Sequence, residues 1–280
     1  MWLVQCRTYI FRILHRNNFK NYMNLLEKTI AIDIGNSFIK IKHNDNDNIH
    51  FIHSDEFTLD NLKKHIDSIE KINFVAVSAV DTEMECKMVD FFAANNTVVF
   101  LADSLLRRQK NIDFSNIQGM GVDRKLGLFG ATKFFESPII TIDCGTAITI
   151  NILSKDNICL GGAIMCGVGT QSRALEYYTS SLPKARVDFK SFDNIDNTEN
   201  AISAGIISAT RGGIIDFVSS AIYKKNIQNA NIIFTGGYSS QVFKLCRNRF
   251  NKISTQSKIK SVEIKNHLVL YGLEKLAEVE

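Results

Sequence analysis

The feature that most constrains this chain is a short turn, Asp-x-Gly between two apolar runs, which occurs twice. Residues 29–42 place apolar runs on both sides of a bend that holds Asp33 and Gly35. Residues 139–152 repeat this order around Asp143 and Gly145. Each stretch is predicted to form a β-hairpin, because β-branched runs flank a polar turn. The repetition predicts two similar domains.

Both turns carry groups that suit a metal-bound polyphosphate. A carboxylate at the end of a strand can bind Mg²⁺, and the glycine and hydroxyl or amide residues after it can face phosphate oxygens. Asp and Gly are also common in ordinary turns, so one copy alone favours a plain hairpin. The second copy favours two domains that face each other, each offering one turn to the same phosphate chain.

Between and after the hairpins, predicted strands and helices alternate, which indicates an α/β protein. A helix over 58–71, a strand over 74–78, a helix capped by Asp81 and a strand over 98–101 follow the first hairpin. We expect the domains to divide the chain into an N-terminal extension at 1–29, a first domain at 30–137 and a second at 138–280. The elements predicted further along are helices over 125–135, 174–180, about 198–223 and 267–277, and a strand over 232–235.

Glycines and other small residues mark three further places. The segment 160–169 is glycine-dense, which indicates close backbone approach to a ligand or to another strand. The turn after 232–235 fits a nucleotide lying against backbone or a plain strand-to-helix turn capped by a serine at 239 or 240. The long helix at 198–223 has a small-residue seam for close packing, formed by Ala201, Gly205, Ser208 and Gly212.

Charge and cysteine content exclude several classes of function. The net charge is +4, and residues 1–29 hold five basic residues and one acidic, which leaves 28 of each sign in residues 30–280. The neutral body gives no reason to expect nucleic-acid or membrane binding. The six cysteines lack metal-ligand spacing and indicate buried thiols in a reducing cytoplasm. No apolar run approaches the roughly 18 residues of a membrane span.

Residues 1–22 are basic and mildly amphipathic, with no acidic residue. They fit a targeting peptide or a membrane-surface helix. We favour an upstream extension or a misplaced start, in which Met23 begins the functional chain.

The chain resembles the type III pantothenate kinase family over roughly residues 30–277. Six motifs carry this resemblance and occur in the family's order. They are Asp33-x-Gly-Asn-Ser-x-x-Lys40, Gly121-x-Asp-Arg124, Asp143-x-Gly-Thr-Ala-x-Thr149, Gly161-Gly-x-Ile-x-x-Gly167, Asn197-Thr198 and Thr235-Gly-Gly237.

The resemblance implies a duplicated actin-like (ribonuclease-H-like) kinase fold with an ATP cleft between two domains. It implies phosphorylation of pantothenate to 4′-phosphopantothenate, the first step of coenzyme A synthesis, by a cytoplasmic homodimer. Mg²⁺ accompanies ATP, and Asp143 resembles the ligand of a monovalent cation, K⁺ or NH₄⁺. Asp123 resembles the proton acceptor. The implied ATP contacts are Asp33, Ile34, Gly35, Asn36, Ser37, Phe38, Ile39, Lys40 and Thr146, and the implied pantothenate contacts are Phe114, Gly121, Val122, Asp123, Arg124 and Thr198, the last reaching the partner subunit's site.

The Asp123-Arg124 pair has a plain alternative, because an acidic residue near a helix N-terminus stabilises the helix whatever its chemistry. Phe114 stands where the family usually has a tyrosine, and Cys166 where it has a proline, so we expect altered substrate affinity rather than lost chemistry. Two competing functions stay open: another small-molecule kinase of the superfamily, and a nucleotide-binding accessory factor for transcription.

Overall fold

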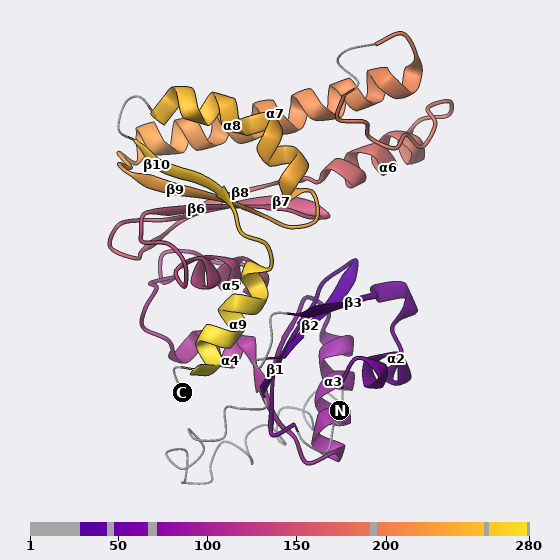
Figure 1. Ribbon diagram of the computed structural model, residues 1–280, viewed down its shortest axis with the longest axis vertical. Helices are drawn as coiled ribbons and strands as arrows, with labels where there is room; N and C mark the ends of the chain where they lie inside the picture. Colours follow the sequence, from indigo (N-terminus) through magenta and orange to yellow (C-terminus); the bar gives the residue numbers. More distant parts are fainter. Residues whose placement is uncertain (1–28, 44–47, 67–71, 191–194, 255–257, 279–280) are drawn as a thin grey trace. The chain divides into compact units, whose positions relative to one another are not determined.

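The structure is a computed structural model and describes residues 29–43, 48–66, 72–190, 195–254 and 258–278 (Figure 1). These residues divide into two compact units. The first unit contains the described residues up to Lys110, with Gly121–Leu126 and the chain from Val269. The second contains Asn111–Met120 and Gly127–Leu268. The N-terminal extension predicted at residues 1–22 lies outside the described residues.

The first unit is built on a five-stranded sheet in the order β3-β2-β1-β4-β5. The predicted hairpin is confirmed, because β1 (Thr29–Ile34) pairs antiparallel with β2 (Phe38–His43). β3 (Ile49–His53) extends it, and β4 (Phe74–Ala79) and β5 (Val98–Leu101) run parallel to β1. Parallel pairing requires a helical crossover, and α3 (Thr82–Ala94) supplies it between β4 and β5.

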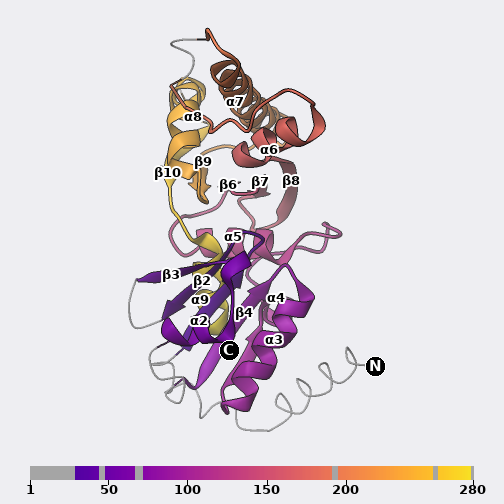
Figure 2. The same ribbon diagram turned by 90° about the vertical axis from the view of Figure 1, so that its right-hand side faces the viewer.

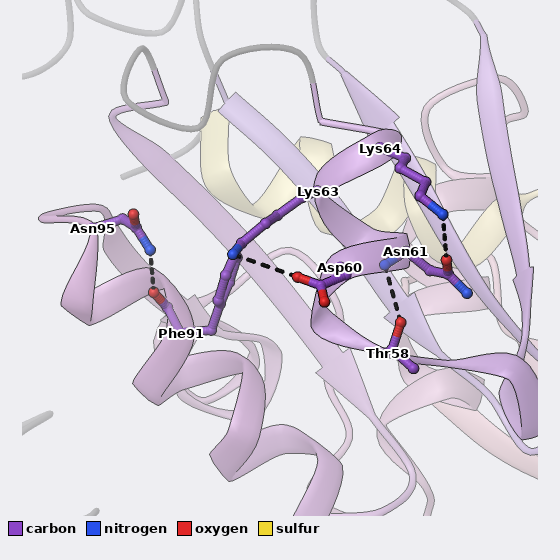
Figure 3. Close-up of polar contacts among 7 residues, drawn as sticks. All are labelled: Thr58, Asp60, Asn61, Lys63, Lys64, Phe91 and Asn95. Atoms are coloured by element: carbon purple, nitrogen blue, oxygen red, sulfur yellow. Dashed lines mark hydrogen bonds and ion pairs between the residues drawn. The ribbon is translucent and has the colours of Figure 1, made fainter.

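The first helices begin at the residues that the sequence predicts. Asp81 caps α3, with its carboxylate accepting from the backbone N–H of Glu83 and Met84. Thr58 caps α2 (Leu59–Lys64), where its hydroxyl accepts from the Asn61 backbone N–H at 3.0 Å (Figure 3). Residues 67–71 of the predicted helix lie outside the described residues. A short 3₁₀ turn, η3 (Ser54–Glu56), precedes α2, and α4 (Ala102–Arg108), which the sequence analysis did not predict, follows β5.

One face of the first sheet packs against α2 and α3 through apolar side chains, including Ile32, Ile41 and Phe92. On the opposite face, Lys42 points toward the C-terminal helix α9 (Leu268–Glu278). Its Nζ lies 2.5 Å from Glu274 Oε1, and both side chains are 4% exposed. The last helix of the chain therefore belongs to the first unit.

The second unit repeats the connectivity of the first. Its sheet has the order β10-β9-β6-β7-β8, with β6 (Ile139–Cys144), β7 (Ala147–Leu153) and β8 (Cys159–Cys166) antiparallel. β9 (Ala230–Thr235) and β10 (Ile259–Ile264) run parallel to β6. Strand for strand, β6 to β10 occupy the places of β1 to β5. This repetition confirms the predicted duplication of an α/β unit.

The second unit also contains the helices α6 (Val168–Tyr178), α7 (Thr198–Lys224) and α8 (Ser239–Ser254). α7 and α8 lie side by side over one face of the sheet (Figures 1 and 2). The core between them contains Ile142, Ile214, Val218 and Phe234. α5 (Val122–Ala131) begins in the first unit and ends in the second.

Two observations concern α7, whose predicted extent is confirmed. By length and composition α7 is apolar enough to cross a membrane, although no such run was predicted. Core helices pass the same test, and nine residues of α7 are buried within this chain. The predicted small-residue seam does not pack within the chain either, because Ala201, Gly205, Ser208 and Gly212 are all exposed.

Other boundaries also differ from prediction. α5 begins three residues earlier than the predicted Lys125, and α6 begins six residues before the predicted Ala174. β10 was not predicted, because its residues are partly exposed and show only a weak alternation of apolar and polar side chains. The compact units interleave along the chain, whereas the predicted boundary at 137/138 separates only the two sheets. Of the five described cysteines, Cys144, Cys159 and Cys246 are buried as expected, but Cys86 is half-buried and Cys166 exposed.

Candidate active site

The first Asp-x-Gly turn is held by hydrogen bonds within its own unit. The Gly35 backbone N–H donates to Phe38 O at 3.1 Å and closes the bend. Ser54, at the end of β3, donates its hydroxyl to Gly35 O at 3.1 Å and its backbone N–H to Ser37 O at 3.0 Å. The turn is therefore held in place by Ser54, a residue that no local sequence pattern singled out.

Asp33 and Lys40 form the charged part of this turn. They are register partners on β1 and β2, and Lys40 Nζ lies 3.0 Å from Asp33 Oδ2. The Asp33 side chain is 7% exposed and that of Lys40 29% exposed. A buried carboxylate beside a partly exposed ammonium group leaves the ammonium group accessible to a polyphosphate.

The side chains of residues 33–40 do not all face solvent. Ile34 and Ile39 are buried in the first core, so they can meet a ligand only through their backbone. Asn36 and Phe38 are exposed, and Gly35, Ser37 and Lys40 are half-buried. The polar groups at the turn are thus backbone amides, the Asn36 amide, the Ser37 hydroxyl and the Lys40 ammonium group.

The second turn has the same start and a shorter bend. Asp143 follows the buried Ile142 on β6, and the Gly145 backbone N–H donates to Ala147 O at 3.1 Å. The last strand pair is Cys144 with Ile148, so the bend is one residue shorter than the first, where Ile34 pairs with Ile39. The predicted structural equivalence of Asp33 and Asp143 is confirmed by their places on β1 and β6.

The start of α6 packs onto this second turn. Gly167 donates its backbone N–H to Thr146 O at 3.0 Å, and the Thr170 hydroxyl donates to the same oxygen at 2.7 Å. A Cβ on Gly167 would lie 2.5 Å from Thr146 O, so only glycine fits there. Thr146 itself is exposed. Two glycines of 160–169 therefore serve close backbone approach: Gly162 lies against Ile150 of β7, and Gly167 lies against the turn.

The turn after β9 leads directly into α8, so the prediction of a strand-to-helix turn is confirmed. α8 begins at Ser239, so Ser239 and Ser240 are its first residues and not its cap, and the Ser239 hydroxyl donates to Asn266 Oδ1 at 2.8 Å. The Tyr238 backbone N–H donates to Cys144 O at 3.0 Å, which joins this turn to the end of β6.

Burial is the main cause that raises the pKa of the Cys144 thiol, and the neighbouring Asp143 charge raises it further. The thiol is therefore neutral and no nucleophile.

The residues predicted to contact the phosphate acceptor belong to both units. Asp123 and Arg124 lie in the first turn of α5, half-buried, in the first unit. A Cβ on Gly121 would lie 2.5 Å from Asp123 Oδ1, so the carboxylate folds back over that glycine. Phe114 is half-buried in the second unit, and Thr198 is exposed at the start of α7, where Asn197 caps the helix.

Asp33 and Asp143 are the carboxylates that could bind the implied cations, Mg²⁺ and K⁺ or NH₄⁺. Among the described residues, no cluster of three or more His, Cys, Asp or Glu side chains is arranged to hold a metal ion. Mg²⁺ needs no such cluster, since it usually keeps several waters and binds one or two carboxylates together with substrate phosphates. Asp33 beside its turn fits that pattern. Asp143, half-buried at the end of β6, offers carboxylate oxygens, which are ligands that hard cations accept.

The family model of type III pantothenate kinases matches residues 29–220. The chain belongs to this family. Type III pantothenate kinase from Synechococcus elongatus is 30% identical over 57% of this chain and 60% of the relative, and that from Christiangramia forsetii is 28% identical over 75% and 86%. The chain thus spans about three fifths of the first of these relatives.

Solved structures support the fold. A propionate kinase from Francisella tularensis (TM-score 0.50, 8% identity) covers 89% of this chain and is itself covered to 98%. An acetate kinase from Porphyromonas gingivalis (TM-score 0.50, 11% identity) covers 91% and is covered completely. At such low identity the likeness concerns the fold alone, and it confirms the predicted duplicated actin-like class.

Proposed function

We propose that this protein transfers the γ-phosphoryl group of ATP to pantothenate and forms 4′-phosphopantothenate, the first step of coenzyme A synthesis. The observation that carries the proposal is the pair of equivalent Asp-x-Gly hairpins in a chain of this family. Phosphoryl transfer needs chiefly positioning and neutralisation of charge, and two backbone-rich turns with carboxylates and a lysine provide both.

Asp33 to Lys40 and Thr146 bind the ATP phosphates in this proposal. The amides of the first turn and the Lys40 ammonium group face phosphate oxygens, and the Thr146 hydroxyl provides a further contact. Asp33 holds Mg²⁺ through water or directly, and Asp143 holds K⁺ or NH₄⁺. When bound, these cations neutralise charge on the polyphosphate.

Asp123 accepts the proton of the pantothenate primary alcohol as that oxygen attacks the phosphorus atom. The Arg124 guanidinium group, next along the same helical turn, binds the pantothenate carboxylate. Gly121 and Val122 border the acceptor, and Phe114 covers it with an apolar ring. Because Phe114 has no hydroxyl, it offers packing without a hydrogen bond.

The proposal includes a homodimer, in which Thr198 contacts the partner subunit's acceptor site. The exposed small-residue seam of α7 supports this assembly, since small side chains allow two helices to approach closely. The neutral body gives no basis for nucleic-acid or membrane partners, and burial along α7 supports a core helix in a cytoplasmic enzyme.

A turnover assay with ATP, Mg²⁺ and K⁺ tests the function. With pantothenate as the acceptor, we expect ADP and 4′-phosphopantothenate to form in equal amounts. With sugars or acetate as the acceptor, we expect no turnover. Turnover with another acceptor only would assign a different small-molecule kinase. Nucleotide binding without turnover of any acceptor would favour the accessory-factor alternative.

A further inference from the structure

Gly236 lies directly against the Asp143 carboxylate within the second unit. It is the first residue after β9, and its φ of +91° is a conformation that residues with a side chain rarely adopt. A Cβ built on Gly236 would meet Asp143 Oδ1 first, closer than any real Cβ contact, and would lie 2.8 Å from Cys144 N. The space that a side chain would need is therefore occupied by the carboxylate and the end of β6.

The turn that carries Gly236 has little freedom to move away. The Ser239 backbone N–H donates to Gly236 O at 3.0 Å, and the Tyr238 N–H donates to Cys144 O at 3.0 Å. On the strand side, Thr235 is the register partner of Asp143. Hydrogen bonds after Gly236 and the strand pairing before it thus hold its backbone beside Asp143.

Asp143 Oδ1 also faces a second glycine. A Cβ on Gly145 would lie 3.6 Å from the same oxygen, which is ordinary van der Waals contact. The neighbouring Gly237 differs from both, because a Cβ there would meet nothing within 4 Å. Of the two consecutive glycines after β9, only Gly236 is required by the geometry of the carboxylate.

We propose that Gly236 is a positioning residue that sets the orientation of the Asp143 carboxylate toward its cation. The proposal rests on the proposed cation role of Asp143. A methyl group at residue 236 either rotates the carboxylate or pushes the turn away from β6, and both changes misplace the oxygen ligands. This role explains why residue 236 is a glycine, and it does not require the turn to contact adenine or ribose.

The first test is a stability cycle, which does not depend on the reaction. We expect Gly236→Ala to lower Tm by about 5–15 °C, because overpacking and a positive φ both destabilise. In an Asp143→Ala background the loss should fall to about half or less, since the closest contact is gone while the strain at φ and the contact with Cys144 remain. If Gly236→Ala alone is insoluble, recovery of soluble protein in the double variant is the expected result. Equal losses in both backgrounds would overturn the proposal.

The second test measures cation dependence of turnover, with Gly237→Ala as the matched control. We expect Gly236→Ala to raise the half-saturating K⁺ concentration by about tenfold or more, and Gly237→Ala to change neither that concentration nor Tm. A normal half-saturating concentration in Gly236→Ala, despite a lower Tm, would reduce Gly236 to a structural glycine. If the unmutated enzyme turns over without responding to K⁺, the proposed cation role fails, and the stability cycle still decides whether Gly236 and Asp143 interact.

Discussion

Lys40 Nζ and Asp33 Oδ2 lie 3.0 Å apart on neighbouring strands, close to the first Asp-x-Gly turn. The pair places one positive and one negative group on the same face of the sheet, because register partners project to the same side. In the proposed reaction the two groups serve different ligands, with the ammonium group on phosphate and the carboxylate on Mg²⁺.

Lys40→Met should therefore raise KM for ATP by about 10- to 100-fold, the range expected for loss of one charged hydrogen bond. Tm should fall as well, because the Asp33 carboxylate is only 7% exposed and loses its charged partner. Steady-state kinetics with Lys40→Arg as the charge-conserving control measure the effect. An unchanged KM in Lys40→Met would remove Lys40 from the phosphate site.

Asp123→Asn should lower kcat by about 10²–10⁴-fold, equivalent to about 3–5 kcal/mol of barrier, because a neutral amide cannot accept the alcohol proton. Loss of the charge near the α5 N-terminus should cost only about 0.3–1 kcal/mol of stability. Asp60→Asn is the matched control, since Asp60 lies in the first turn of α2. Near-normal turnover in folded Asp123→Asn protein would leave Asp123 a helix-stabilising residue.

The buried pair of Lys42 and Glu274 should be strongly coupled. Glu274→Gln should destabilise the protein by about 3–5 kcal/mol, because it leaves the Lys42 ammonium group without its charged partner in a site that is 4% exposed. Lys42→Met with Glu274→Leu should restore most of that loss, since apolar replacements need no partner.

Urea unfolding measures both variants. The control is Lys260→Met, which breaks the exposed pair with Glu136 at 3.2 Å and should have no measurable effect. If the double variant is as unstable as Glu274→Gln, the packing of α9 depends on more than charge pairing.

Local patterns in the sequence were sufficient to predict the parts of the fold that depend on neighbouring residues. Asp81 predicted the start of α3, and Asp33 and Asp143 predicted equivalent hairpins, because caps and turns are set by residues a few positions apart. The contact between Lys42 and Glu274 was not predictable, because 232 residues separate them.

Predictions that depend on tertiary packing were less successful. The small residues of α7 indicated close packing, but a sequence pattern does not say whether the partner is in the same chain. Gly236 was recognised as part of a turn, whereas its contact with Asp143 depends on the parallel pairing of β6 with β9. The family motifs predicted the residues of the candidate site but not what surrounds them.

Removal of residues 1–22 should leave Tm and turnover nearly unchanged. The family match begins at residue 29, and the first motif begins at Asp33. Thermal unfolding and the turnover assay, applied to the full chain and to a chain that starts at Met23, give the comparison. Insolubility or lost activity of the shorter chain would show that the segment contributes to the folded enzyme.

The last prediction concerns the proposed cation at Asp143. Turnover should require K⁺ or NH₄⁺ and fall sharply when Na⁺ replaces them, because oxygen ligands spaced for a larger ion hold the smaller one poorly. Asp143→Ala should abolish the K⁺ response together with most activity, since the phosphates then lose compensating charge.

The measurement is a KCl titration of turnover at constant ionic strength, so that general screening stays the same at every point. Tetramethylammonium chloride makes up the ionic strength, because that ion is too large for a site of a few oxygen atoms. Thr146→Ala is a useful comparison, because it removes a proposed ATP contact on the same turn and leaves the Asp143 carboxylate in place. It should raise KM for ATP while the half-saturating K⁺ concentration stays normal. A flat K⁺ response in the unmutated protein would leave Asp143 as a structural or Mg²⁺-linked carboxylate.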